Sequence, residues 1–273
     1  MHFSGGLANH MFQYAFAYSM AKERNLQLII ADDNMLIDHF NIKPNVFEDH
    51  GFNNKACCCF WVRQDEVDCG YDNRHENLPN TDLSFHRYFQ SWKYWIKYEK
   101  DIRNIFRFRS DIVALADVQF RSIVLERKIS THNTTIIGIH IRNGDYSDSH
   151  FASYGYQVAP ASYLTSATNY YKNRFKNILF IVCTNDLKWT SKVLSNENNI
   201  YIAKGNSAAV DMALLSMTNH TIMTVGTYGW MIAWLTGGTT IHYKYPYVPG
   251  SRFSHQFHKN YSDHFYPGWI PME

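Results

Sequence analysis

The sequence predicts an α/β protein whose second half contains a doubly wound parallel sheet. From residue 136 onward, short continuous apolar segments alternate with segments of helical periodicity, a pattern typical of strands buried on both faces of a sheet. Glycine turns precede two of the expected helices, at Gly5-Gly6 and at Gly226. Hydrophobic residues make up 45% and charged residues 18% of the 273 residues, so the composition is globular and excludes intrinsic disorder.

Charge and hydropathy argue against a nucleic-acid partner and against a membrane-spanning segment. The 26 Lys and Arg nearly balance the 24 Asp and Glu, and no basic run is present, which argues against a nucleic-acid partner. No apolar run approaches the roughly 20 residues that a membrane helix needs, so we expect no membrane span in this chain. Aromatic residues reach 16%; they pack cores, but they also form stacking platforms for bases and sugars.

The first half begins with a glycine turn and a helix. After Gly5-Gly6, apolar residues recur at helical spacing, and the run Leu26–Ile30 then reads as a strand. The strand expected before the glycines is missing. Residues 40–90 lack periodicity and are interpreted as loops with short elements, followed by helical regions at about 99–108 and up to about 125. The polar stretch 130–135 is the best candidate boundary between two domains, 1–130 and 131–273.

The second half alternates regularly between the two kinds of element. Because ligands of such sheets bind outside the carboxyl ends of the strands, the residues that follow each strand are the candidates for function. The expected strands are 136–141, 178–183, 200–203, 221–225 and 239–243, and the expected helices are 161–171, 188–194, 208–217 and 227–235.

The first of these strands ends in His140-Ile-Arg142-Asn143-Gly-Asp145. The planar donor fork of Arg142 suits phosphate oxygens. An ion pair between Arg142 and Asp145 that merely shapes a turn is the alternative. After the next strand, residues 184–186 are expected to cap the following helix.

A second candidate site feature follows the strand 221–225. The turn Gly226-Thr227-Tyr228-Gly229 opens a helix, whose first N–H groups and positive dipole end attract anions. It is neither a P-loop nor the full dinucleotide fingerprint. Together with Arg142 it suggests a diphosphate site. No D-x-D motif occurs, so a nucleotide diphosphate would be neutralised by Arg and amide dipoles, and no divalent metal or other cofactor is expected.

The five cysteines do not form a zinc pattern. One residue of the triplet Cys57–Cys59 could bridge to Cys69, or these residues could be buried free thiols. Cys183 ends an apolar run and is expected in the core.

Several motifs resemble the α-1,2-fucosyltransferases of glycosyltransferase family 11. The opening Gly5-Gly-Leu-Ala-Asn9-His-Met-Phe-Gln-Tyr-Ala resembles the family's G-G-L-G-N-Q-M-F-Q-Y-A, and His140-Ile-Arg142-Asn143-Gly-Asp-Tyr resembles H-x-R-R-G-D-Y. Asp211-Met-Ala-Leu-Leu and the segment 219–238 are close to the animal form of the family, and Tyr88-Phe-Gln-Ser and Tyr266-Pro-Gly-Trp269 fit as well. The resemblance spans essentially the whole chain.

The resemblance implies a GT-B-like architecture of two Rossmann-like halves. Residues 1–130 would form the acceptor side and residues 131–273 the GDP-fucose-binding domain. The implied enzyme is an inverting hexosyltransferase that moves L-fucose from GDP-fucose to a hydroxyl of a galactose-terminated glycan, in α-1,2 linkage, without metal. A location in the Golgi lumen or membrane is likewise inherited from the family.

The resemblance also implies roles for individual residues. Arg142 would hold the departing β-phosphate, and Thr227, Tyr228 and Gly229 would donate to the pyrophosphate. Asn9 would lie near the donor sugar. By analogy with the more distant core and protein O-fucosyltransferases, His140 and Asp211 would contact the guanosine.

The catalytic base and the activity itself stay open. Asp145, Asp148 and His150 are all candidates for the base, and Asp145 is taken as the catalytic one. The family's second Arg is Asn143 here, which would remove a cation from the donor site. The alternative to an active enzyme is therefore a catalytically silent paralogue that binds nucleotide or glycan. A generic nucleotide-binding reductase is disfavoured, because the G-x-G-x-x-G turn is lacking.

Overall fold

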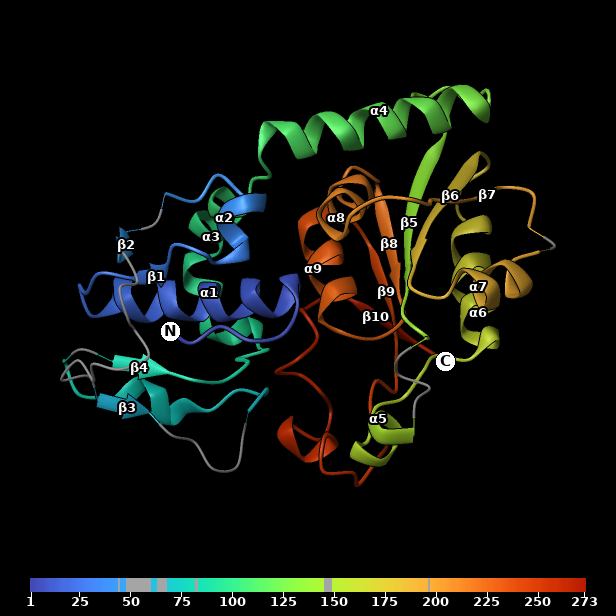
Figure 1. The fold of residues 1–273 in the computed structure, drawn as a ribbon. Coiled ribbons are helices and arrows are strands. Elements are labelled where there is room, and N and C mark those ends of the chain that lie inside the picture. The colour runs from blue at the N-terminus through green and yellow to red at the C-terminus, as the bar shows by residue number, and fades with distance from the viewer. Residues whose placement is uncertain (44, 48–59, 63–67, 82, 145–148, 196) are drawn as a thin grey trace. The chain divides into compact units, whose positions relative to one another are not determined.

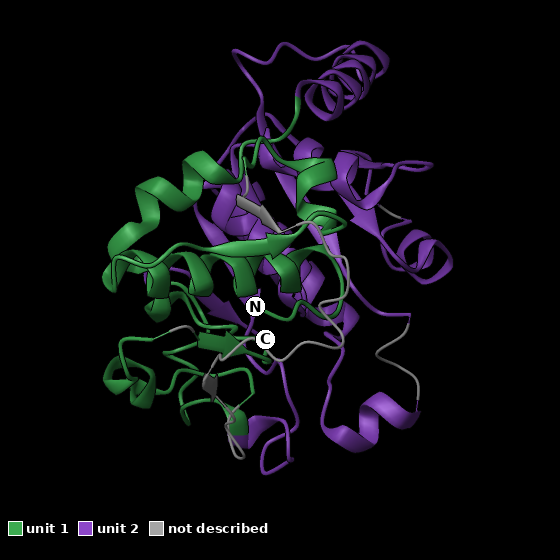
Figure 2. Cartoon of the chain, turned by 60° about the vertical axis from the view of Figure 1, so that its left-hand side comes forward, with its two compact units in different colours: residues 1–109, 256–266 green, residues 110–255, 267–273 purple. Residues whose placement is uncertain are grey.

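The chain folds into two compact units. The computed structural model describes residues 1–273 except 44, 48–59, 63–67, 82, 145–148 and 196. Unit 1 comprises residues 1–109 and 256–266, and unit 2 comprises residues 110–255 and 267–273 (Figure 2). The units divide at residue 109 and not at the expected boundary near 130, because helix α4 (Ser110–Glu126) packs against α8 (Ala208–Ser216) of unit 2.

Unit 1 is organised by its first helix, α1 (Leu7–Glu23), whose expected apolar positions are all buried. The helix ends in a Schellman motif: Asn25 has a φ of 54°, and the N–H of Leu26 donates to the carbonyl of Ala21 (2.8 Å). The expected strand 26–30 is therefore shifted to β1 (Ile29–Ala31), since Leu26 still belongs to the helix end.

The core of unit 1 is aromatic. The rings of Phe16 and Phe89 stack with their centroids 3.6 Å apart, and Phe85 and Tyr94 pack edge-on against Phe16. The other helices and strands of this unit are α2 (Met35–His39), β2 (Asn45–Phe47), β3 (Phe60–Val62), β4 (Leu83–Phe85), α3 (Glu99–Ile105) and the 3₁₀ helices η1 (Asn73–Asn77), η2 (Trp92–Tyr94) and η3 (Ile96–Tyr98). The strands pair in parallel as β1–β2 and β3–β4.

The late segment 256–266 belongs to unit 1 because side-chain oxygens hold it there. Gln256 Oε1 accepts from the backbone N–H of Asp68 (2.8 Å) and of Cys69 (3.2 Å). The fully buried carboxylate of Asp263 accepts from the N–H of Tyr71 (3.1 Å). These long-range bonds have no signature in the sequence.

Unit 2 contains the expected doubly wound sheet. Six parallel strands lie in the order β10-β9-β8-β5-β6-β7 (Figure 1). The strands are β5 (Thr135–Ile141), β6 (Ile178–Thr184), β7 (Ile200–Ile202), β8 (His220–Met223), β9 (Thr240–Tyr243) and β10 (Ile270–Met272), and the remaining helices are α5 (Ser149–Tyr154), α6 (Ala161–Lys172), α7 (Leu187–Val193), α9 (Thr227–Thr236) and η5 (Ser254–Gln256).

Helices cover both faces of this sheet. Figure 1 shows α6 and α7 on one side and α8 and α9 on the other. Ile137, Ile139 and Ile141 of β5 point to the α6 face, where they join Tyr163 and Tyr171 in one buried core. The alternate residues of β5, including His140, point to the α8–α9 face. The fold thus confirms the α/β class and the doubly wound sheet.

The strand order places a topological switch point between β5 and β8. From β5 the chain proceeds outward to β6 and β7, then returns to the other side of β5 and continues through β8, β9 and β10. Ligands of open α/β sheets bind outside the carboxyl ends of the strands at such a point. In the described part of the chain, no helix is both long and apolar enough to cross a membrane.

Candidate functional site

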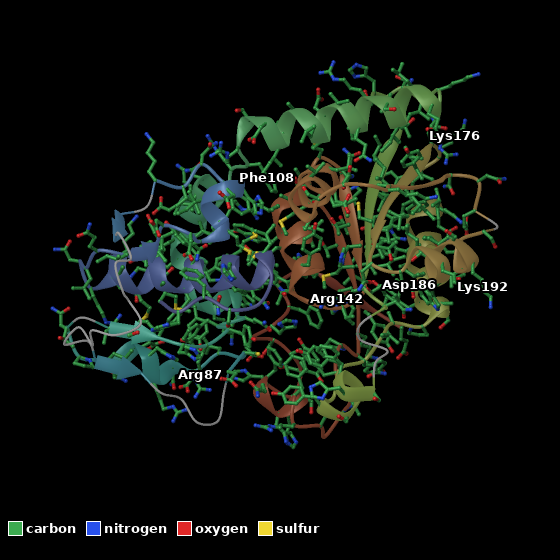
Figure 3. All side chains as sticks on the ribbon, viewed as in Figure 1. Arg87, Phe108, Arg142, Lys176, Asp186 and Lys192 are labelled. Atoms are coloured by element: carbon green, nitrogen blue, oxygen red, sulfur yellow. The ribbon has the colours of Figure 1, made fainter. Side chains whose placement is uncertain are left out.

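Arg142 follows β5 at this switch point. Its backbone N–H donates to Thr224 Oγ1 (3.0 Å), and the N–H of Thr224 donates to the carbonyl of His140 (3.1 Å). Thr224 follows β8 directly and stands two residues before Gly226. Partly buried Arg142 is thus tied through its backbone to the turn that opens α9, at the lower end of the sheet in Figure 3.

Asn143 is anchored to the opposite neighbour of β5. Its backbone N–H donates to Asn185 Oδ1 (3.0 Å), and its side-chain amide donates to Asp186 Oδ2 (2.9 Å). Asp186 also caps α7 as expected, because its Oδ1 accepts from the N–H of Trp189 (3.0 Å). These bonds to Trp189 and Asn143 hold the pKa of the Asp186 carboxyl below its usual value.

The turn into α9 requires a glycine. Gly226 has φ 88° and ψ 158°, a backbone conformation essentially restricted to glycine. The first bond of the helix runs from the N–H of Trp230 to the carbonyl of Gly226 (3.3 Å), so the N–H groups of Tyr228 and Gly229 have no acceptor within the helix. The ten-residue helix directs its positive dipole end toward this edge of the sheet.

His140 is buried beneath this turn. A Cβ added at Gly229 would lie only 2.7 Å from His140 Nδ1, so glycine is what lets α9 approach the imidazole. Burial, and secondarily the charge of Arg142, lower the pKa of His140 to about 3. Its Nδ1 is buried and has no hydrogen-bond partner among the described residues. A neutral imidazole therefore faces the switch point at neutral pH.

Asp211 lies in the first turn of α8 on the same face. Its carboxylate accepts from Asn206 Nδ2 (2.7 Å). Burial raises the pKa of the Tyr228 hydroxyl and of the Cys183 thiol, and the charge of Asp211 adds to both shifts. Cys183 is paired in register with His140, and the ring centroids of Tyr228 and His140 lie 4.9 Å apart. Asp211, Tyr228 and His140 therefore form one cluster.

Asn9 lies in unit 1, in the first turn of α1. Its Oδ1 accepts from Gln90 Nε2 (3.1 Å). The glycine turn before it is held by the fully buried Gln13, whose amide donates to the carbonyl of Arg87 (3.0 Å) and whose Oε1 accepts from the N–H of Ser4 (3.1 Å). The opening motif is thus a turn held by hydrogen bonds, and Asn9 lies in the first turn of the helix that follows it.

The structure therefore gathers the residues predicted in unit 2 at one edge of one sheet: His140, Arg142, Asp211, Thr227, Tyr228 and Gly229. Asp145 and Asp148 lie outside the described residues, whereas His150 lies in α5. Cys69 and Cys183 are buried free thiols, and Cys57–Cys59 lie outside the described residues. Across the residues that the structure describes, no three His, Cys, Asp or Glu side chains gather to hold a metal ion.

Sequence reasoning missed one residue of this edge and underestimated two others. Thr224 lies within the expected strand 221–225, where a single buried threonine does not indicate a role in the site. Asn185 and Asp186 were expected as helix caps, but they also bind Asn143. Nothing in the sequence could have indicated that bond.

A doubly wound parallel sheet with a basic residue and a glycine-led helix at its switch point is typical of nucleotide-binding α/β enzymes. The model of glycosyl transferase family 11 matches residues 1–273, and the chain belongs to this family.

Two relatives agree with the family, and two solved structures share the fold. The chain is 27% identical over 98% of its length to galactoside alpha-(1,2)-fucosyltransferase 2 of Sus scrofa, covering 78% of that protein. It is 26% identical over 97% of its length to galactoside 2-alpha-L-fucosyltransferase SEC1 of Bos taurus, covering 71% of it. The fold is similar to that of fucosyltransferase NodZ from Bradyrhizobium (TM-score 0.58, 18% identity, 84% of this chain and 90% of that chain). It is also similar to NodZ alpha-1,6-fucosyltransferase soaked with GDP-fucose (TM-score 0.54, 17% identity, 84% and 89%). The expected family and GT-B-like fold are confirmed.

Proposed function

We propose that this chain transfers L-fucose from GDP-fucose to a hydroxyl of a galactose-terminated glycan, in α-1,2 linkage and with inversion. Family membership and the names of the curated relatives support the activity and the linkage. A Golgi location belongs to the same proposal and rests on the family alone. The observation that carries the chemistry is the bond from the backbone N–H of Arg142 to Thr224 Oγ1, which fixes the backbone of Arg142 beside the residues that lead into α9.

The proposed donor site neutralises a diphosphate without a metal ion. Arg142 would bind the β-phosphate oxygens, and the N–H groups of Tyr228 and Gly229 would donate to the pyrophosphate. Charge-assisted bonds of this kind strengthen as the leaving group gains charge, and each donor is typically worth roughly 3–4 kcal/mol in a transition state. The neutral His140 and the carboxylate of Asp211 would contact the guanosine.

The transfer step forms one bond and breaks another. The acceptor oxygen attacks the anomeric carbon of fucose as the bond from that carbon to the β-phosphate oxygen breaks, and GDP leaves with the bonding electrons. The acceptor hydroxyl loses its proton to a base. Asp145 is the proposed base, with Asp148 and His150 as alternatives. Asn9 of unit 1 would contact the donor sugar.

A transfer assay tests the proposal. Wild-type chain is incubated with GDP-fucose and an array of galactosides, and the product linkage is determined. We expect α-1,2-fucosylated product from the wild type and none from Arg142→Ala. Arg127→Ala is the matched control: it removes the same charge from unit 2 at the other end of the sheet, where Arg127 donates to the carbonyl of Ile200 (2.6 Å).

Two results would contradict the proposal. GDP binding without transfer to any acceptor would favour the silent paralogue. Full activity of Arg142→Ala would mean that another group stabilises the departing GDP.

A further inference from the structure

Two consecutive residues after β5 are held from opposite sides. The N–H of Arg142 binds Thr224, which follows β8, whereas the N–H and the side chain of Asn143 bind Asn185 and Asp186, which follow β6. Since β5 lies between β8 and β6 in the sheet, residues 142 and 143 are hydrogen-bonded to the segments that follow both neighbouring strands. These hydrogen bonds are 2.9–3.0 Å long.

The side chain at position 143 is part of this anchor. Asn143 is 9% exposed, and its amide is committed to the Asp186 carboxylate. Asp186 is itself fixed, because its other oxygen caps α7 and its N–H donates to Thr184 Oγ1 (3.0 Å). The bond therefore connects the residue after Arg142 to the beginning of a helix.

We propose that Asn143 and Asp186 form a positioning pair that sets Arg142 for the diphosphate. Asn143 does not contact the nucleotide. It acts through Arg142: its side chain holds the backbone next to the cation and adds no cation of its own. This inference rests on the proposed function, because it assumes that Arg142 binds a diphosphate.

The sharpest test exchanges the donor and the acceptor of the hydrogen bond between residues 143 and 186. Asn143→Asp places two carboxylates against each other. In Asp186→Asn, a single side-chain oxygen must accept from both the Asn143 amide and the N–H of Trp189. In the double variant, the carboxylate introduced at position 143 accepts from the amide introduced at position 186, whose oxygen still caps α7, so every bond is restored with donor and acceptor exchanged. GDP is titrated against all four proteins by calorimetry, and thermal midpoints are recorded in parallel.

We expect Asn143→Asp to weaken GDP binding by about tenfold or more and Asp186→Asn by about two- to tenfold, because each leaves a buried polar group poorly paired. The double variant should bind GDP more tightly than Asn143→Asp alone. In an Arg142→Ala background, Asn143→Asp should change GDP affinity by less than about twofold, since the two residues would act as one unit.

Tyr171→Phe is the matched structural control. It deletes the bond from the Tyr171 hydroxyl to the carbonyl of Thr239 (2.7 Å), at the amino end of the same sheet. This control should lower the thermal midpoint and leave GDP affinity unchanged. Should Asn143→Asp fail to fold, Asp186→Asn carries the test, because asparagine is also a good helix cap.

The outcomes separate the two proposals. If the wild type does not bind GDP, the proposed function fails. If the wild type binds GDP and Asn143→Asp or Asp186→Asn binds it equally well, the positioning pair is refuted. It is also refuted if the double variant binds no better than Asn143→Asp, or if Tyr171→Phe weakens GDP binding as much.

Discussion

The buried imidazole of His140 predicts that the chain loses stability in acid. Burial lowers its pKa from 6.5 to about 3 in the folded chain, so below pH 6.5 the unfolded chain binds a proton that the native chain does not. The free energy of unfolding therefore falls as the pH falls, from about 6.5 down to about 3. For this single group the loss between pH 8 and pH 5 is about 2 kcal/mol.

Urea denaturation at pH 8 and at pH 5 measures this loss. The comparison is between the wild type and His140→Gln, which cannot titrate; contributions from all other groups cancel in the difference. We expect the wild type to lose about 2 kcal/mol more than the variant over this range. Equal losses in the two proteins would mean that the imidazole is not held neutral by burial, and would refute the packing of α9 against it.

Three further predictions concern the glycines and the metal. Gly229→Ala places a Cβ 2.7 Å from His140 Nδ1; we expect about 1–3 kcal/mol less stability and weaker GDP binding, and unchanged calorimetric and thermal titrations would contradict this. Gly238→Ala makes a Cβ overlap the backbone oxygen of Asn219, which cannot rotate away, so its thermal midpoint should fall further than that of Gly229→Ala; an equal or higher midpoint would contradict the close approach. Transfer should persist in EDTA, whereas activity lost on chelation and restored by Mg²⁺ or Mn²⁺ would argue against a metal-free donor site.

The sequence predicted the second half of the fold well because its strands are continuous apolar runs bounded by polar residues. β5, β6 and α9 begin and end within one residue of the expected positions. The edge strand β10 was not predicted, since it has three residues and contains Pro271. Its pairing with β9 depends on a neighbour that is distant in sequence.

The first half was predicted less well, and for a physical reason. Its elements after α1 are short, and the unit is completed by residues 256–266, which are held by Gln256 and Asp263. Side-chain oxygens that bind distant backbone N–H groups leave no periodicity in a sequence. The helix α4 was expected, but its packing on α8 of unit 2 was not.

For the candidate site too, features local in sequence could be predicted and long-range contacts could not. The positions of Arg142 and the α9 turn could be predicted, because both stand directly after apolar strands. The direction of the Asn143 side chain could not, since it depends on which strand lies beside β5. Only the strand order shows that the neighbour is β6 and that the carboxylate of Asp186 is there to receive the amide.

The most direct measurement compares GDP with GMP as ligands of the wild type, Arg142→Ala and Arg127→Ala. If Arg142 binds the β-phosphate, the wild type and Arg127→Ala prefer GDP by about 10- to 150-fold, the size of one charge-assisted hydrogen bond. In Arg142→Ala this preference falls by about the same factor, and only the contribution of the Tyr228 and Gly229 N–H groups remains. A preference for GDP that is undiminished by the loss of Arg142 would contradict the account.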